Sequence, residues 1–368
     1  MQDIKGIPTG VSRLSKLVEL YPPAFEGNRL NLLFLEDAWP ITNPKEYLIR
    51  LDSQELAREQ REYYLGDPCE WPFPTISIED KPDPWAISTA LFNWPERARQ
   101  VLTVQSQIGQ ILVQRARAIS ADVVALMIVD GFSYFDLPQS IQAEPCLVDG
   151  VTTTQYGYRQ VIGKPSVAQR LFCAGYRDQI GLTYFDKDTN SLARELYATF
   201  GHSQVHRVKS FEEGLTVLRT CTVNPSFVQI TAPGLDHLCH NHPDAPPLNE
   251  YIRIILSRFD ALICCLKSKG KRVLGCLTAD HGILWRKEFE QKAVVLDTLT
   301  VEDTWHPRYV LGSYLRTFSR VVKHEGCSYS LLQLPYLTRP LKRTEWGVHG
   351  GVSAWESIVP LITTEVIC

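Results

Sequence analysis

The chain has 368 residues, a formal net charge of −3 and a hydrophobic fraction of 44%. At roughly 150 residues per domain, this length allows two or three domains, or one large α/β domain with an ample core. The near-neutral charge excludes a general basic surface for duplex nucleic acid and leaves room only for a local basic cleft.

No targeting or membrane signal is seen in the sequence. The first residues lack a basic stretch followed by an apolar one, and no apolar run reaches the ~20 residues that span a bilayer. The ten cysteines show no paired Cys-x-x-Cys spacing of the kind that zinc fingers need. We therefore expect a reduced, cytoplasmic protein with no membrane partner.

Residues 1–120 are predicted to form a helical or mixed cap region whose role the sequence does not indicate. Residues 29–35 fit a strand, and Asp52 with Glu55 resembles a capping box that opens a charged helix. Residues 67–84 are rich in proline and acidic residues, which favours an extended connection.

A helix is predicted from Pro95 to about Ala118. Proline suits the first helical turn, and Leu102, Ile108 and Leu112 give an apolar stripe at helical spacing.

A continuous apolar run, Val123 to Val129, is broken abruptly by Asp130 and Gly131. Such a run predicts a strand buried on both faces of a mostly parallel sheet. In open α/β sheets, catalytic groups collect where the strands end. Asp130 is therefore a candidate site residue, although Asp-Gly alone is also typical of a turn or a helix cap.

A threonine-rich turn, Thr152 to Thr154, precedes a segment predicted to be helical until Gly163. A threonine at a helix start commonly serves as the N-cap. Its hydroxyl can also act as a nucleophile when a metal lowers its pKa and the positive end of the helix assists.

Histidines gather after a predicted strand at residues 226–231. Asp236 and His240 are four residues apart, so on a helical turn they share one face and can grip one ion, whereas His237 and His242 point elsewhere. A solvated polar loop is the alternative interpretation.

Two further segments have the same form. The strand pattern 272–279 ends in Asp280, His281 and a glycine, and adjacent side chains at a strand end diverge, so that they can serve two metals. His349 lies in a glycine-rich turn before the apolar run 358–363, which predicts the last strand. Together, three aspartates, three histidines and a hydroxyl form the ligand set of a two-metal phosphoryl-transfer centre.

The order of these motifs resembles the alkaline phosphatase superfamily of metalloenzymes. The order is an aspartate after a strand, a threonine in a Thr-rich turn, Asp-x-x-x-His, Asp-His-Gly and a late histidine. The ending from His349 to Ile362 is similar to the PglZ branch, which is associated with bacterial phage-defence systems of the BREX type and also occurs fused to response regulators. The similarity covers roughly residues 123–363.

This resemblance implies an alkaline-phosphatase-like α/β core, a mostly parallel sheet flanked by helices, in a catalytic domain over residues 121–368. It implies two divalent metal ions, with Zn²⁺ fitting the mixed nitrogen and oxygen ligands best and Mn²⁺ as the alternative. Carried over by position, the metal that also binds the nucleophile is held by Asp130, Asp280 and His281, and the other by Asp236, His240 and His349.

The same resemblance implies Thr154 as the nucleophile, with Thr153 as the alternative. Residues 151–154 stand where the family shows Pro-x-x-Thr, and Gly157 falls at the matching offset. Three departures are seen: Val151 replaces the proline, the spacing to Gly163 is short, and Cys239 stands where many relatives have glycine.

The implied reaction has two steps: Thr154 attacks phosphorus in line, and water then hydrolyses the phosphothreonine. The implied substrates are phosphodiesters, including linear or cyclic oligonucleotides, in phage defence or signalling with protein partners of a defence system. Aromatic residues such as Trp285 and Trp305 could stack bases, although core packing is the commoner use of aromatics.

The alternative functions are a phosphomonoesterase and a non-catalytic, metal-stabilised scaffold of a defence complex. The complete ligand set argues against the scaffold. The chain has no Cys-x-Pro-x-Arg sulfatase signature, and a phosphoglycerate-mutase-like enzyme would need a large inserted domain.

Overall fold

The computed structural model describes most of the chain from residue 83 onward. The described residues are 25–26, 29–30, 73–74, 76, 83–183, 205–208, 210–220, 225–240, 242–269, 271–296, 306–313, 318–324 and 326–366. The capping-box helix predicted after Asp52, most of the strand predicted at residues 29–35, most of the connection 67–84 and Trp305 lie outside them.

An eight-stranded sheet forms the centre of the described structure. Its spatial order is β3 (Thr103–Val104), β5 (Glu144–Leu147), β17 (Ile358–Val366), β9 (Val273–Ala279), β4 (Val123–Val129), β8 (Ser226–Ala232), β6 (Asp178–Thr183) and β7 (Val205–Arg207). β17 runs antiparallel to both of its neighbours, and all the other pairs are parallel. The predicted strands at 123–129, 226–231 and 272–279 are thus adjacent in space.

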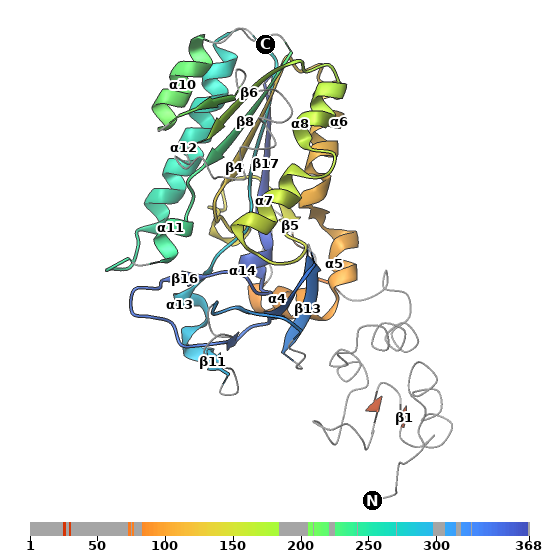
Figure 1. Ribbon diagram of the computed structural model, residues 1–368, viewed down its shortest axis with the longest axis vertical. Coiled ribbons are helices and arrows are strands. Elements are labelled where there is room, and N and C mark those ends of the chain that lie inside the picture. Colours follow the sequence, from red (N-terminus) through yellow and green to blue (C-terminus); the bar gives the residue numbers. More distant parts are fainter. Residues whose placement is uncertain are drawn as a thin grey trace, which may run out of the picture.

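Helices cover both faces of this sheet (Figure 1). One layer holds α6 (Ile108–Ala118), α7 (Thr154–Ile162) and α8 (Val167–Cys173), and the other holds α10 (Phe211–Thr220), α11 (Asp236–Cys239) and α12 (Leu248–Lys267). The predicted α/β class with a mostly parallel, helix-flanked sheet is confirmed.

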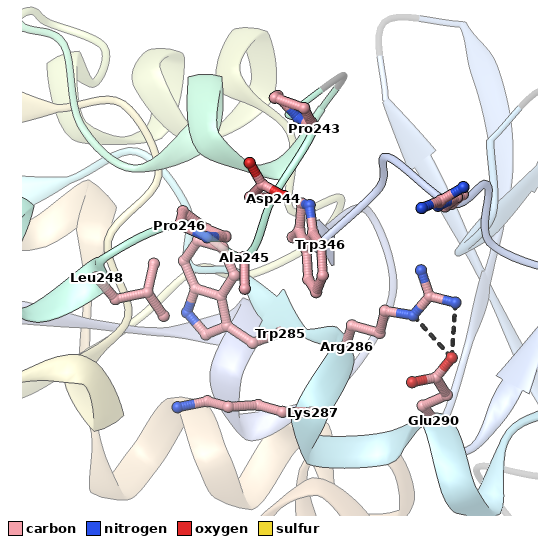
Figure 2. Close-up of a pocket in the computed structure, with 11 residues that line it drawn as sticks. Pro243, Asp244, Ala245, Pro246, Leu248, Trp285, Arg286, Lys287, Glu290 and Trp346 are labelled. Carbon is pink, nitrogen blue, oxygen red and sulfur yellow. Dashed lines mark hydrogen bonds and ion pairs between the residues drawn. The ribbon is translucent and has the colours of Figure 1, made fainter.

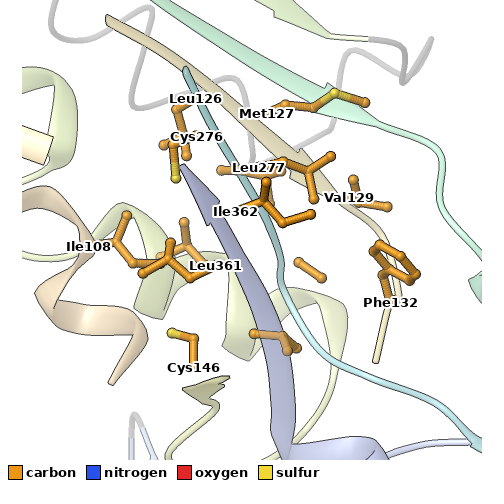
Figure 3. Packing of buried hydrophobic residues seen from close by; sticks show 14 of the residues in the cluster. Ile108, Leu126, Met127, Val129, Phe132, Cys146, Cys276, Leu277, Leu361 and Ile362 are labelled. Carbon is orange, nitrogen blue, oxygen red and sulfur yellow. The ribbon is translucent and has the colours of Figure 1, made fainter. Parts of the chain in front are cut away.

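The core lies along both faces of the central strands (Figure 3). All seven residues of β4 are buried, because parallel strands are covered on both sides by their crossover helices. Met127, Leu277 and Ile362 lie in the same cluster on three adjacent strands. Each such side chain contributes roughly 1.5–3 kcal/mol by leaving water, so the strand ends stand on a rigid base.

The single helix predicted from Pro95 to Ala118 is wrong. The structure has α5 (Pro95–Val101), then β3, a 3-10 turn η3 (Gln105–Gln107) and then α6. The break arises because Thr103 and Val104 pair with β5 at the edge of the sheet, and the side chain of Gln105 is fully buried. Tertiary pairing therefore overrides the helical periodicity.

Residues before the boundary predicted at residue 120 pack with those after it. α4 (Pro84–Asn93) contacts α14 (Ala354–Ser357), and Ile87, Leu112 and Ala116 belong to the main core cluster. From residue 84 onward, the described chain forms one packed body with the sheet.

The described residues form four smaller sheets besides the central one. The two-stranded sheets are β1 (Phe25–Glu26) with β2 (Arg29–Leu30), β10 (Leu284–Trp285) with β16 (Gly347–Val348), and β11 (Val294–Val295) with β15 (Tyr336–Leu337). A three-stranded sheet has the order β12 (Tyr309–Leu311), β14 (Cys327–Leu332) and β13 (Ser319–His324). The remaining turns are η4 (Tyr134–Asp136), α13 (Arg286–Phe289) and η6 (Glu290–Lys292). Among the described residues, no helix has the length and apolar character to cross a membrane.

Candidate metal centre and active site

Three aspartates lie together where neighbouring parallel strands end. Asp130 follows β4, and its backbone N–H donates to Ala232 O of β8 at 3.1 Å. Asp280 follows β9 and donates to Val129 O of β4 at 3.2 Å, and the Asp236 N–H donates to Asp130 O at 3.2 Å. The hydrogen-bonded ladder of the sheet thus continues into the aspartates and fixes their backbone positions.

One group that could hold a metal consists of Asp130, Asp280 and His281, whose ligand atoms all lie within 4.8 Å of one another. The side chains of Asp280 and His281 are only 3% and 0% exposed. Asp280 Oδ1 accepts hydrogen bonds from the N–H groups of Gly131 at 3.0 Å and His281 at 2.8 Å, which orient the carboxylate.

A second group consists of Asp236, His281 and His349. His349 Nε2 lies 3.2 Å from Asp236 Oδ1, and the rings of His281 and His349 stack with centroids 4.3 Å apart. His281, assigned from sequence to one metal only, therefore lies between the two groups.

His240 lies at the edge of this arrangement. α11 ends at Cys239, and His240 lies in extended backbone. Contrary to the prediction, His240 therefore does not share a helical turn with Asp236. Its Nε2 still lies 3.8 Å from Asp236 Oδ1, and its side chain is 42% exposed. His240 belongs to neither compact group but remains within reach of the second.

Thr154 is the first residue of α7 and points at the first group. Its Oγ1 donates to Asp130 Oδ1 at 3.1 Å and lies 3.2 Å from His281 Nε2. Thr153 is the N-cap and makes no side-chain capping bond. Of the two threonines, Thr154 is the one that contacts the candidate ligands.

Hydrogen bonds to backbone carbonyls set the tautomers of His281 and His349. His281 Nδ1 lies 3.0 Å from Gly282 O, and His349 Nδ1 lies 3.0 Å from Thr152 O. A carbonyl only accepts, so Nδ1 holds the proton and the Nε2 lone pair faces the carboxylates. Nitrogen lone pairs and carboxylates that face one another are stabilised by a cation between them. Metal-ligating histidines usually show this pattern, with the other ring nitrogen donating to a carbonyl or carboxylate.

Asp236 supplies a second indication of a cation site. Its Oδ1 is buried and has no hydrogen-bond partner of good geometry among the described residues. An unpaired buried carboxylate oxygen is costly unless a charge compensates it. The donor set therefore fits divalent metal ions held by mixed nitrogen and oxygen ligands.

Electrostatics agree with this interpretation. Burial, reinforced by the charge of Asp236, raises the pKa of Asp130. Burial, reinforced by Asp130, raises the pKa of Asp280 well above its usual value. For Asp236, burial acts to raise the pKa, but the close approach of His349, with His281 and His240 further off, lowers it overall. Two buried carboxylates that resist ionisation together become stable anions when a cation is bound.

Gln105 supports the first group, and sequence reasoning missed it. Its Nε2 donates to the carbonyls of Ala279 and Asp280, both at 2.8 Å, from a fully buried position. Gly157 on α7 packs so closely that an added Cβ would lie 1.7 Å from Asp280 O. These contacts fix the distance between Asp280 and the helix that presents Thr154, and only the offset of Gly157 was visible in the sequence.

A buried network supports His349. Arg308 and Glu356 form an ion pair at 2.9 Å with both side chains fully buried, and Glu356 also accepts from the Gly351 N–H at 2.9 Å. Thr152 Oγ1 accepts from the Gly350 N–H at 2.8 Å and donates to Gly351 O at 3.1 Å. Neither residue was identified from the sequence. A glutamate placed among apolar residues could have indicated Glu356, whereas no sequence pattern indicated Arg308.

His306 also lies near the second group. It stacks on Tyr309 with ring centroids 4.3 Å apart, and the ring of Tyr309 covers Gly350 so closely that a Cβ there would meet it at 2.5 Å. Burial, followed by the charges of His349 and Arg339, lowers the pKa of His306 to about 4. Nothing in the sequence pattern singled out this histidine.

The other histidines of the 236–242 segment turn away, as predicted. The ring of His237 packs on Tyr251 at 5.5 Å, and His242 Nδ1 lies 2.6 Å from Asp244 O. Cys239 is accommodated because its Sγ lies against Gly347, where a Cβ would approach to 3.0 Å.

No family model matches this chain, and no curated protein matches it. Among solved structures, an inactive variant of murine ectonucleotide pyrophosphatase/phosphodiesterase 5 in complex with AMP is 13% identical with a TM-score of 0.43, over 65% of this chain and 87% of that one. Phosphonoacetate hydrolase from Sinorhizobium meliloti 1021 in complex with phosphonoacetate is 15% identical with a TM-score of 0.42, over 67% and 91%.

A variant of TAB5 alkaline phosphatase with bound Mg is 10% identical with a TM-score of 0.30, over 66% of this chain and 91% of that one. All three TM-scores are below 0.5.

Proposed function

We propose that this chain is a metal-dependent phosphodiesterase of the alkaline phosphatase superfamily, with Thr154 as its nucleophile. One observation supports this function above all others. Thr154 Oγ1 lies within 3.2 Å of both Asp130 Oδ1 and His281 Nε2, at the start of a helix and beside both candidate ligand groups. A structural threonine cap would instead bond to its own helix.

The side chains divide the chemistry between them. Asp130 accepts the hydrogen bond of the Thr154 hydroxyl and orients its oxygen. Oγ1 releases its proton to solvent and bonds to phosphorus as the bond from phosphorus to the leaving oxygen breaks, which leaves a phosphodiester on Thr154. Water then attacks phosphorus, and Oγ1 departs and takes up a proton released by that water, which regenerates the threonine.

Two divalent ions, when bound, would supply Lewis-acid stabilisation of the phosphoryl oxygens. Asp130, Asp280 and His281 would hold the ion next to Thr154, and Asp236, His240 and His349 would hold the other. The shared position of His281 suits a closely spaced pair. We propose Zn²⁺ because the ligands mix imidazole and carboxylate, with Mn²⁺ as the alternative.

For the substrate we propose a phosphodiester, including nucleotide or oligonucleotide diesters. No lysine or arginine side chain forms a hydrogen bond with Thr154 among the described residues, and a monoester enzyme needs such a cation for the extra phosphoryl charge. From the ending at residues 349–362, we further propose the PglZ branch and a role in bacterial phage defence within the cytoplasm.

The test is hydrolysis of bis-p-nitrophenyl phosphate against p-nitrophenyl phosphate with added zinc or manganese. We expect metal-dependent diester cleavage in the wild type and in Thr153→Ala, and its loss in Thr154→Ala. Intact mass should show the p-nitrophenyl phosphoryl adduct only where Thr154 is present. Turnover that survives in Thr154→Ala would exclude the nucleophile, and binding of two metals without turnover of either ester would favour a scaffold.

A further inference from the structure

A separate pocket of about 510 Å³ is lined by residues of the segments 243–248, 285–290 and 343–346 (Figure 2). Its volume falls within the range that small-molecule sites occupy. It is lined by neither Thr154 nor any candidate metal ligand. A molecule bound in this pocket would therefore contact neither the proposed nucleophile nor the candidate metal ligands.

The lining combines aromatic, apolar and basic side chains. The indoles of Trp285 and Trp346 line it together with Pro246 and Leu248 (Figure 2). Trp346 is half-buried, and its Nε1 donates to His242 O at 2.9 Å, so one edge of the indole is fixed. A fixed indole beside apolar side chains is a stacking surface for a planar aromatic group.

The basic side chains differ in how far they are already paired. Arg286 is held by Glu290, with Nε 2.7 Å from its carboxylate. Arg343 is exposed and has no bond to any other residue in the described part of the chain. Because guanidinium binds phosphate strongly and Arg343 has no competing partner, an anion at the mouth of the pocket would be stabilised there.

The pocket wall is bonded to the segments that hold the second ligand group. The Trp346 N–H donates to Cys239 O at 2.9 Å, next to His240 in sequence, and the Arg286 N–H donates to Trp346 O at 2.8 Å. β10 and β16 pair Leu284 with Val348, directly before His349. A displacement of Trp346 would therefore reach His240 and His349 through one hydrogen bond or a few residues of backbone.

We propose that this pocket binds a planar aromatic anion of the nucleoside monophosphate class, and that its occupancy changes metal affinity at Asp236, His240 and His349. A purely apolar ligand would leave Arg343 unused, and an inorganic anion would leave the partly exposed indole of Trp346 uncovered. The binding half of this inference is independent of the proposed function, whereas the coupling half rests on the second metal site.

Binding is tested first in the absence of metal. Adenosine 5′-monophosphate is titrated by isothermal calorimetry into the full-length Asp280→Asn variant after EDTA treatment. The substitution and the chelator together exclude binding at a metal-loaded centre. We expect the nucleotide to bind saturably with one-to-one stoichiometry. Adenosine and inorganic phosphate should each bind at least ten times more weakly. Trp346→Ala should weaken binding roughly ten-fold or more, and Trp346→Phe should restore part of it.

Matched controls separate the pocket from the general charge and aromatic content. Arg343→Ala should weaken nucleotide binding but leave the affinity for adenosine unchanged. Lys342 is an exposed neighbour outside the lining, so Lys342→Ala should bind the nucleotide as tightly as the protein without this substitution. Trp85→Phe, which packs on Trp355, should also bind normally. No binding at millimolar nucleotide, or equal effects of Lys342→Ala and Arg343→Ala, would overturn the proposal.

Coupling is tested by titrating zinc into the wild type with and without the nucleotide. We expect the affinity of one of two zinc sites to change about five-fold or more, and zinc to change nucleotide affinity by the same factor, because linkage is reciprocal. The change should vanish in Trp346→Ala. Unchanged zinc affinity at saturating nucleotide would contradict coupling while leaving both the pocket and the proposed hydrolysis intact.

Discussion

The two candidate ligand groups are built differently. Asp130 and Asp280 follow adjacent central strands, and their backbone N–H groups continue the sheet ladder. His240 and His349 lie on segments beyond the sheet, and His240 is 42% exposed. The nucleophile side is therefore rigid, whereas the other side depends on loop contacts that a ligand or mutation can shift.

The largest expected effect comes from replacing one ligand on each side, which tests this comparison directly. Asp280→Asn should lower diester turnover by at least ~10³-fold, because a buried carboxylate oriented by two N–H bonds has no substitute. His240→Asn should cost only ~10–100-fold, because water can replace an exposed edge ligand. Turnover and zinc stoichiometry measure both, and equal losses would contradict the asymmetry.

An intermediate effect is expected from Gln105→Met, which removes two hydrogen bonds to the carbonyls of Ala279 and Asp280. Leaving buried carbonyls unpaired costs about 1–3 kcal/mol. Zinc affinity should fall at the Asp280 side alone, with turnover about ten-fold lower. Gln110→Met on the exposed face of α6 is the matched control, and a uniform loss at both zinc sites would indicate a general structural role instead.

The smallest effect on turnover is expected at Asp136, which belongs to neither ligand group and changes stability instead. Its Oδ1 accepts from Trp285 Nε1 at 3.0 Å, and burial raises its pKa to about 7 despite this bond. Since the folded pKa exceeds the unfolded value near 3.8, the unfolded chain loses this proton first. The stability that Asp136 contributes is therefore full below its unfolded pKa and is lost as the pH rises through about 7.

The corresponding measurement is urea unfolding of metal-free wild type and Asp136→Asn between pH 5 and 8. At 1.36 kcal/mol per pKa unit, the wild type should lose about 2 to 3 kcal/mol relative to the variant over this range. Parallel pH profiles for the two proteins would show that Asp136 is already ionised when folded.

Much of the sheet was predictable because its strands are long apolar runs with abrupt polar ends. The predicted strands at 123–129, 226–231 and 272–279 match β4, β8 and β9 to within one residue. The interruption of the helix predicted from Pro95 was not predictable, because the pairing of Thr103 with Cys146 depends on residues far away in the sequence.

The sequence by itself determined which residue types follow which strands, and thus the aspartates at the carboxyl edge, since strand ends are set by local composition. Only the tertiary structure decided that Thr154 rather than Thr153 contacts Asp130, and that His281 lies between both groups. It also decided that Gln105 holds the backbone of Asp280. These arrangements depend on how helices and loops pack on the sheet, and contacts across 174 residues of chain leave no local pattern in a sequence.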